Sequence, residues 1–321
     1  MRALIVMNPH SGGGKVERFA LVERARQLGA DVALTGPDLD AAELVRRGAE
    51  QGAQVLGVAG GDGSVSAAAA VAADVDRPLL VIPAGTRNHF ARDLGLDLRD
   101  PAAAMDALHD GEPVRVDLGV VRSRVSVDSQ VLVDSRVFVN NVSFGLYAEA
   151  LLEPGYRQAK ARAFASVAPR YLEGRQAVEA AVRAPQEMID GPQVVLISNN
   201  PYHLATLRHL GRRFGLDAGL LGLVVIKRPA ELPPAPPDLL THLRAELRRE
   251  PRTGSPSAGV VTWAAPTVEL SGSGPVPTGI DGEPVTLELP VRCSIRPQAL
   301  QVLLPRRRPG VPPEPTRGRR P

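Results

Sequence analysis

The chain has 321 residues, of which 44% are hydrophobic and 23% are charged, so it is long enough for two packed cores and is not wholly disordered. Cys293 is the only cysteine, which excludes an internal disulfide bond and a cysteine-based zinc site. No apolar run reaches the roughly 18 residues of a membrane-spanning helix, and the run at residues 4–7 is too short for a signal peptide. We therefore expect a cytoplasmic protein.

The positive charge of the chain is concentrated at its C-terminal end. Residues 306–321 hold six arginines and one glutamate, a net charge of +5, which leaves −2 for the rest of a chain whose formal charge is +3. We expect this tail to be disordered and to offer peripheral contact with an anionic membrane, with a solvated tail that has no role as the alternative. Aromatic residues make up only 3% of the chain, so nucleic acid is not an expected partner.

Short apolar strands alternate with amphipathic helices through the first third of the chain. In chain order, the pattern predicts strands at 3–7, 31–34, 54–59 and 79–82, and helices at 16–28, 41–51, 65–73 and 102–108. Strands that alternate with helices indicate a doubly wound α/β domain with a parallel sheet.

From about residue 114 the chain becomes rich in predicted strands. They fall at 125–128, 131–139, 194–198, 223–226, 260–263, 267–270, 285–289 and 300–304, with one helical stretch at 158–182 and connections at 229–237 and 251–259. This pattern predicts a C-terminal antiparallel β-sandwich domain. We place the α/β domain at 1–123, the β-rich domain at 124–305 and the tail at 306–321, and the final strand is free to return to the first domain.

Three polar, glycine-containing loops follow the predicted strands of the α/β domain, at the edge where such sheets bind ligands. The first, Asn8-Pro9-His10-Ser11-Gly12-Gly13-Gly14-Lys15, lacks the first glycine and the Ser/Thr of a P-loop. The second is Gly60-Gly61-Asp62-Gly63-Ser64, and the third is Pro83-Ala84-Gly85-Thr86-Arg87-Asn88. Glycines allow backbone amides to approach a polyphosphate, and Asp62 is suited to Mg²⁺. Each loop alone could be a simple strand-to-helix turn.

Taken together, the loops resemble the catalytic domain of the diacylglycerol kinase and sphingosine kinase superfamily, in particular its soluble bacterial lipid kinases. The family's NPxSG start matches Asn8-Pro9-His10-Ser11-Gly12, and its GGDGT motif matches the second loop, with Ser64 in place of threonine. Its PxGTxNDFA motif matches residues 83–91 with His89 in place of the acid, and its DGE signature matches Asp281-Gly282-Glu283. The resemblance covers residues 1–305. NAD kinases share the GGDG loop, but their substrate motifs are not found.

The resemblance implies an ATP- and Mg²⁺-dependent kinase that phosphorylates a lipid hydroxyl. Its fold would be NAD kinase/diacylglycerol kinase-like, with ATP between the α/β domain and the β-rich domain and with an apolar lipid site nearby. The implied nucleotide-binding residues are Asn8, Thr35, Gly60, Gly61, Asp62, Gly63, Ser64, Val65, Ser66, Gly85, Thr86 and Asn88.

Transfer of a phosphoryl group to an alcohol needs an acceptor for the hydroxyl proton. Asp281 and Glu283 flank a glycine and are the candidates, although Asp-Gly is also a common hairpin turn. Asp62 would support Mg²⁺ or the phosphates. The resemblance also implies a metal site in a D-G-L-L stretch of the second domain, but Ala218 stands at the position of the acid here. Asp217 is the neighbouring candidate ligand.

Two alternatives stay open beside a lipid kinase. One is a kinase for a soluble substrate, related to NAD kinase. The other is a nucleotide-binding regulator without activity, since Ser64, His89 and Ala218 depart from the family pattern. The sequence decides neither the lipid nor whether the chain forms a homodimer.

Overall fold

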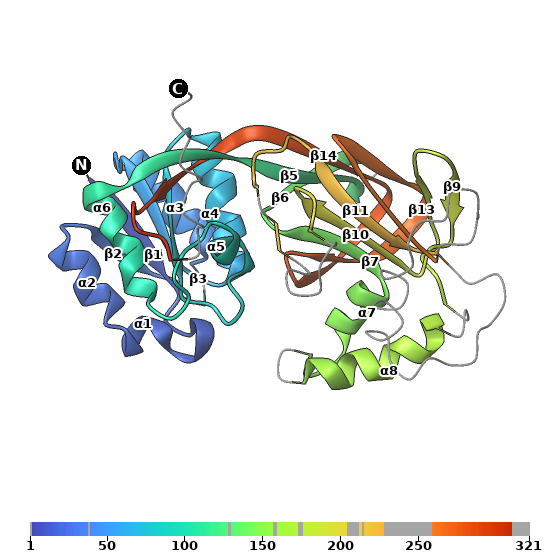
Figure 1. The fold of residues 1–321 in the computed structure, drawn as a ribbon, viewed down its shortest axis with the longest axis horizontal. Helices are drawn as coiled ribbons and strands as arrows, with labels where there is room; N and C mark the ends of the chain where they lie inside the picture. The colour runs from blue at the N-terminus through green and yellow to red at the C-terminus, as the bar shows by residue number, and fades with distance from the viewer. Residues whose placement is uncertain are drawn as a thin grey trace, which may run out of the picture. The chain divides into compact units, whose positions relative to one another are not determined.

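Figure 1 shows the computed structural model, which divides into two compact units, Met1–Arg115 with Leu300–Pro321 (unit 1) and Val116–Ala299 (unit 2). The structure describes residues 2–37, 39–127, 130–156, 159–172, 176–203, 212–213, 215–227 and 259–309. The predicted connection at 229–237, nearly all of that at 251–259, and residues 310–321 of the tail lie outside the described residues.

Unit 1 is built on a parallel sheet in the order β2-β1-β3-β4. Its strands are β1 (Ala3–Met7), β2 (Asp31–Leu34), β3 (Val55–Gly60) and β4 (Leu79–Pro83), each within one residue of its prediction. All residues of β3 and β4 are buried, as expected for strands that are covered on both faces. The end of β14 (Glu283–Leu304) joins the sheet, because Val302 pairs with Leu79 of β4.

Helices cover both faces of this sheet (Figure 1). On one face, α3 (Ala41–Glu50) and α4 (Asp62–Asp74) pack on each other and on β3. On the other, α2 (Leu21–Gln27) packs on β2 and on the 3-10 helix η2 (Pro101–Asp106). The two faces are used because β2 and β3 lie on opposite sides of β1, so that right-handed crossovers place their helices on opposite faces. The prediction of an α/β N-terminal region is confirmed.

Several predicted helices differ from those in the structure. The single helix predicted at 16–28 is two helices, α1 (Lys15–Arg18) and α2, because Ala20 adopts a left-handed backbone with φ of 46°. The helix predicted at 102–108 is η2 followed by α6 (Ala107–Asp110). The short α5 (His89–Asp93) was not predicted. Apolar periodicity detects the buried face of a helix but not a break of one turn within it.

Unit 2 is a strand-rich region of antiparallel pairs. Its strands are β5 (Glu112–Val127), β6 (Gln130–Phe138), β7 (Asn141–Gly145), β8 (Ala181–Arg183), β9 (Met188–Asp190), β10 (Val194–Asn199), β11 (Leu221–Ile226), β12 (Val260–Ala265), β13 (Thr267–Ile280) and most of β14. Successive neighbours are β12-β11-β10-β7-β13-β14. Phe138, Phe144, Ile197 and Val291 are among the buried residues of its one large apolar core. The predicted antiparallel, strand-rich character is confirmed.

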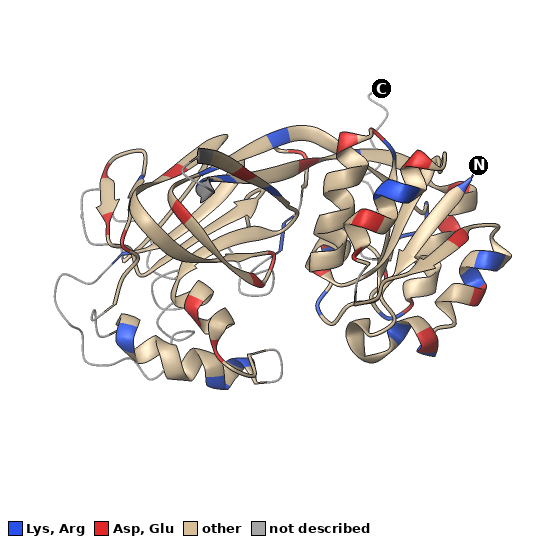
Figure 2. Cartoon of the chain, turned by 180° about the vertical axis from the view of Figure 1, so that it is seen from behind, with Lys and Arg blue, Asp and Glu red and all other residues tan. Residues whose placement is uncertain are grey.

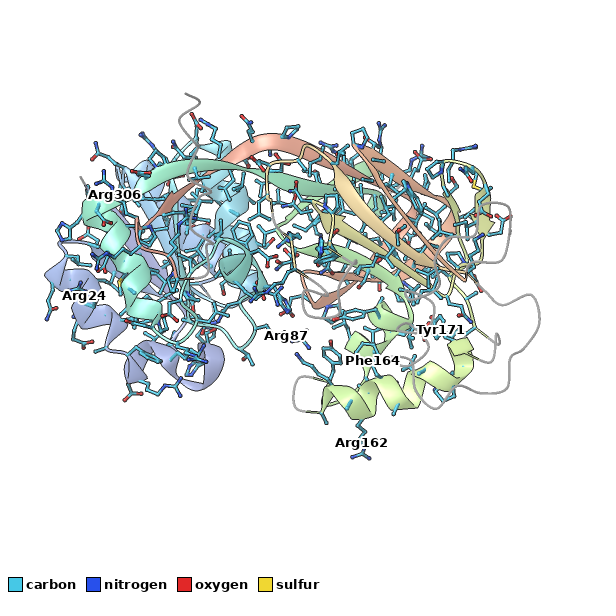
Figure 3. The ribbon with its side chains drawn as sticks, in the orientation of Figure 1. Arg24, Arg87, Arg162, Phe164, Tyr171 and Arg306 are labelled. Carbon is cyan, nitrogen blue, oxygen red and sulfur yellow. The ribbon has the colours of Figure 1, made fainter. Side chains whose placement is uncertain are left out.

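Two helices accompany the strands of unit 2. α7 (Leu146–Leu152) packs on β7 and β13, and α8 (Lys160–Leu172) packs on α7. Phe164 of α8 points toward α7, and the centroids of the rings of Phe164 and Tyr147 are 5.2 Å apart (Figure 3). Arg162 of the same helix points away from α7 (Figure 3). The helical stretch predicted at 158–182 is longer than the helix in the structure. α8 ends at Leu172, and Ala181–Arg183 forms the strand β8.

Charged residues of both signs are scattered over the helices of unit 1 (Figure 2). At the start of the basic tail, Arg306 forms an ion pair with Glu112 at 3.2 Å, and Arg308 donates a hydrogen bond to the carbonyl oxygen of Leu94 at 3.0 Å. These first tail residues thus contact unit 1. Within the described part of the chain, no helix has the length and apolar character needed to cross a membrane.

Candidate active site

Three glycine loops meet at the carboxyl edge of the sheet in unit 1. They are residues 8–14 after β1, residues 60–64 after β3 and residues 83–88 after β4, which we call the first, second and third glycine loops. Within the sheet, β2 is the neighbour of β1 on one side and β3 is its neighbour on the other side. The chain therefore changes direction across the sheet at β1. Open α/β sheets bind their ligands at this change of direction.

Two of the loop glycines, Gly12 and Gly85, lie where the backbones of the loops touch. A β-carbon on Gly85 would lie 2.3 Å from the Cα atom of Gly61, and one on Gly12 would lie 2.3 Å from the carbonyl oxygen of Ala84. Gly12 also has a φ of 57°, a conformation that glycine adopts without strain. The third loop therefore packs directly on both the first and the second.

Lys15 ties the first loop to the third. Its Nζ atom donates a hydrogen bond of 2.9 Å to the carbonyl oxygen of Gly85. Burial and the nearby charge of Arg18 lower the pKa of Lys15. Lys15 was not among the predicted site residues, although its place directly after a glycine run, as in a P-loop, was a usable signal.

Asp62 opens α4, and its carboxylate also caps α5. One oxygen accepts from the backbone N–H of His89 and the other from that of Phe90, both at 3.2 Å. Only 9% of the Asp62 side chain is exposed. Because each carboxylate oxygen can accept more than one bond, Asp62 can serve α5 and still bind a cation. Mg²⁺ in nucleotide sites takes one or two protein carboxylates beside phosphate oxygens and water. Asp62 is therefore suited to such an ion without the three side-chain ligands of an all-protein metal site.

The imidazole of His89 lies beside that carboxylate, with Nδ1 3.6 Å from an oxygen of Asp62. Burial lowers the pKa of His89, and Asp62 acts in the opposite direction by raising it. The folded state thus disfavours the protonated ring. The contribution of His89 to the free energy of unfolding is therefore fully present above the ordinary pKa of about 6.5. It is lost as the pH falls through the lower pKa of the folded protein.

We therefore expect the ring of His89 to titrate below about 6.5 in the folded protein. Asp62→Asn should lower its pKa further, because the charge that favours protonation is removed. NMR titration of the ring protons measures both values. Asp74→Asn, at the exposed far end of α4, serves as the matched control and should leave the pKa unchanged. A higher pKa in Asp62→Asn would contradict this account of the site.

The structure gives the other predicted nucleotide residues different surroundings. Asn88 is buried, and its amide accepts from the N–H of Gly85 at 2.8 Å and donates to the carbonyl oxygens of Pro83 and Gly85, so it braces the third loop. Thr86 is exposed in that loop. Thr35 is half-buried beyond β2, where its N–H donates to the carbonyl oxygen of Met7.

The first two turns of α4 hold four more residues of that set, Gly63, Ser64, Val65 and Ser66. The side chain of Val65 is buried and its N–H donates to the carbonyl oxygen of Gly61, while Ser66 is nearly buried. Ser64 lies against Gly60, where a β-carbon would be 2.9 Å from its Oγ atom. Near Asn8, backbone bonds join the first loop to β3, because the N–H of Asn8 donates to the carbonyl oxygen of Ala59 at 2.9 Å.

In unit 2, Asp281-Gly282-Glu283 forms the turn from β13 to β14. Ile280 pairs with Glu283, and Asp281 and Gly282 have φ values of 49° and 86°, as in a two-residue hairpin of type I′. The carboxylate of Asp281 accepts from the backbone N–H groups of Val139, Asn140 and Asn141 at 2.8–2.9 Å. Glu283 is exposed. The two candidate acids therefore have distinct environments, one holding a neighbouring turn and the other open to solvent.

The residues around Asp217 do not fit a metal ion. Ala218 offers no side-chain ligand, and the N–H groups of Ala218 and Gly219 donate to Asn200 and Asp117 at 2.8 and 2.7 Å. Asp217 is exposed. Among the described residues, no three His, Cys, Asp or Glu side chains gather as a metal site would require. The structure therefore gives no support to Asp217 as a ligand.

An α/β sheet with glycine loops at its change of direction, and with a helix N-terminus among them, is an arrangement that binds phosphate groups. Residues 2–121 match the family model described as the diacylglycerol kinase catalytic domain. A diacylglycerol kinase of Mycobacterium tuberculosis is 40% identical over 119 residues, 36% of this chain and 38% of the length of that relative. The match to this relative thus spans well under half of either protein.

Other relatives match nearly the whole chain. A Pseudomonas fluorescens protein named "Probable lipid kinase YegS-like" is 29% identical over 95% of both chains, and a Staphylococcus carnosus diacylglycerol kinase is 25% identical over 88% of both. The crystal structure of a Bacillus anthracis diacylglycerol kinase has a TM-score of 0.62 at 16% identity, covering 94% of this chain and 96% of that one, and so shares the fold. Residues 2–121 thus match the diacylglycerol kinase catalytic domain, and the predicted resemblance to bacterial lipid kinases is confirmed.

Proposed function

We propose that this protein is a lipid kinase that transfers the γ-phosphate of ATP to a hydroxyl group of a lipid. The observation that carries the proposal is the contact of three glycine loops beside the start of α4, within a diacylglycerol kinase catalytic domain. The relatives described above are named as diacylglycerol or lipid kinases, so a kinase for a soluble substrate is not favoured.

The second glycine loop and the first turn of α4 are the parts suited to the phosphates of ATP, because helix N-termini and glycine backbones present N–H groups to anions. Bound Mg²⁺–ATP supplies the phosphoryl group and the positive charge that stabilises its transfer. Asp62 is the residue suited to hold the metal. Lys15 and Asn88 keep the first and third loops in place through their bonds to Gly85. Thr35 and Thr86 are further proposed nucleotide contacts.

The proton acceptor in this proposal is Glu283. A general base must present its carboxylate to the substrate hydroxyl, and Glu283 is exposed. The carboxylate of Asp281 is held by three backbone N–H groups, which suits it to position the turn. Glu283 would take the hydroxyl proton while the alcohol oxygen attacks the γ-phosphorus. The bond from that phosphorus to the β,γ-bridging oxygen would break, and ADP would leave with this oxygen.

The experiment that tests the function supplies the purified protein with γ-labelled ATP, Mg²⁺ and one acceptor at a time. Acceptors are diacylglycerol or sphingosine in neutral or anionic vesicles, and NAD as the soluble alternative. We expect label in the lipid, and less of it on anionic vesicles when residues 310–321 are removed. Asp62→Asn should abolish the label, whereas Asp74→Asn, at the other end of the same helix, should retain it and so exclude a contaminating kinase. Label in NAD alone, or ATP binding without transfer to any acceptor, would contradict the proposal.

A further inference from the structure

A buried arginine lies at the centre of unit 2. Arg213 is only 3% exposed, and its guanidinium donates to the carbonyl oxygens of Val139 and Asn199 at 2.7 Å and to the side-chain oxygen of Asn140 at 2.9 Å. Three oxygens from two segments of the chain thus surround one cation. Burying a charge is costly unless such partners are present. The arrangement therefore indicates that the guanidinium holds these two segments together.

The same segment connects Arg213 to Asp281. The peptide group between Val139 and Asn140 has its carbonyl oxygen on Arg213 and its N–H on a carboxylate oxygen of Asp281, at 2.8 Å. Its dipole therefore lies between a positive and a negative charge, in the orientation that both charges favour. Removing either charge would weaken the hold on the peptide and on the other charge.

Asp281 in turn fixes the hairpin that carries Glu283. Its φ of 49° is one that aspartate adopts in type I′ turns, and its bonds to residues 139–141 hold the turn in place. The backbone N–H of Asp281 also donates to the carbonyl oxygen of Asn141 at 2.9 Å. Since only Gly282 separates Asp281 from Glu283, an anchored Asp281 sets the direction of the Glu283 side chain.

We propose that the buried guanidinium of Arg213 supplies the positive charge that a bound metal ion would otherwise provide in unit 2, and we call it the internal cation. It organises the turn at 281–283, and Arg213 is thereby a positioning residue for Glu283. The nearby segment at 216–219 supports this, because it presents N–H groups to Asp117 and Asn200 and lacks a side chain at Ala218 that could bind a metal. The part that concerns Glu283 rests on the proposed function, whereas the part that concerns the cation does not.

The first test uses melting temperature, with Arg213→Met, Arg213→Lys and the exposed neighbour Arg212→Met as the matched control. Loss of one partner of a buried charge network should lower the melting temperature of Arg213→Met by about 10 °C. Lysine restores a cation with three donors, so Arg213→Lys should recover part of the loss. The control should melt like the wild type. Without nucleotide, the melting temperature of the wild type should be the same in EDTA and in Mg²⁺. This comparison does not depend on the folding of any variant.

The second test follows catalysis at a temperature where Arg213→Lys is folded. Displacement of Glu283 should lower kcat by about 10²-fold while the dissociation constant for ATP is unchanged. A merely stabilising role would leave kcat of the folded variant near the wild-type value, and that result would overturn the positioning role. Destabilisation of the wild type by EDTA, or normal melting of Arg213→Met, would overturn the internal cation. If no lipid is phosphorylated, the proposed function fails, but the melting experiments still decide the cation.

Discussion

Gly85→Ala is expected to weaken nucleotide binding by forcing two of the glycine loops apart. The new β-carbon would lie 2.3 Å from the Cα atom and 2.9 Å from the N atom of Gly61, so the second and third loops must separate. Overpacking of this kind costs about 1–3 kcal/mol, which should lower the melting temperature by about 5 °C. Loss of even one N–H bond to a charged phosphate would weaken ATP binding by about tenfold or more.

Gly61→Ala is the matched control for the melting temperature alone, because Gly61 lies in the loop proposed to bind the phosphates. Its β-carbon would lie 3.7 Å from Gly85 Cα and 3.8 Å from the Oγ atom of Ser11, which are ordinary contacts, so its melting temperature should be close to that of the wild type. Calorimetric titration with Mg²⁺–ATP, together with thermal melting, measures both variants. Normal ATP affinity in Gly85→Ala would show that the third loop takes no part in the site.

Glu283→Gln should lower kcat by about 10²-fold or more, because the amide cannot accept the hydroxyl proton. The side chain is exposed at the start of β14, so neither the melting temperature nor the affinity for ATP should change. Glu288→Gln, another exposed glutamate on the same strand, is the matched control and should turn over normally. Turnover by Glu283→Gln at the wild-type rate would remove this residue from the mechanism.

Asp281→Asn should lower the melting temperature as well as turnover, and the change in stability separates the two candidate acids. One of its two carboxylate oxygens becomes an NH₂ group that faces a backbone N–H, either that of Val139 or those of Asn140 and Asn141. A buried donor without an acceptor costs about 1–3 kcal/mol, so the melting temperature should fall by several degrees. If Asp281→Asn loses turnover with unchanged stability while Glu283→Gln is active, the two roles are reversed.

The sequence by itself determined the order of the strands and helices in unit 1 and the places where the glycine loops interrupt them. Buried strands such as β3 and β4 are continuous apolar runs, and the loops after them contain glycine and proline, so the signal lies within a few neighbouring residues. Helix boundaries were less well determined. The left-handed turn at Ala20 and the start of α4 at Asp62 depend on how the chain packs after the periodic pattern has been satisfied.

Only the tertiary structure decided what the polar residues of the candidate site do. Asp62 caps a helix that begins 27 residues later, Asp281 holds a turn about 140 residues earlier, and Arg213 reaches back to residues 139 and 140. A motif identifies such residues by type, but their hydrogen-bond partners come from segments that the fold alone brings together. Because a buried charge is stable only with those partners, its role is set by long-range contacts that no local pattern contains.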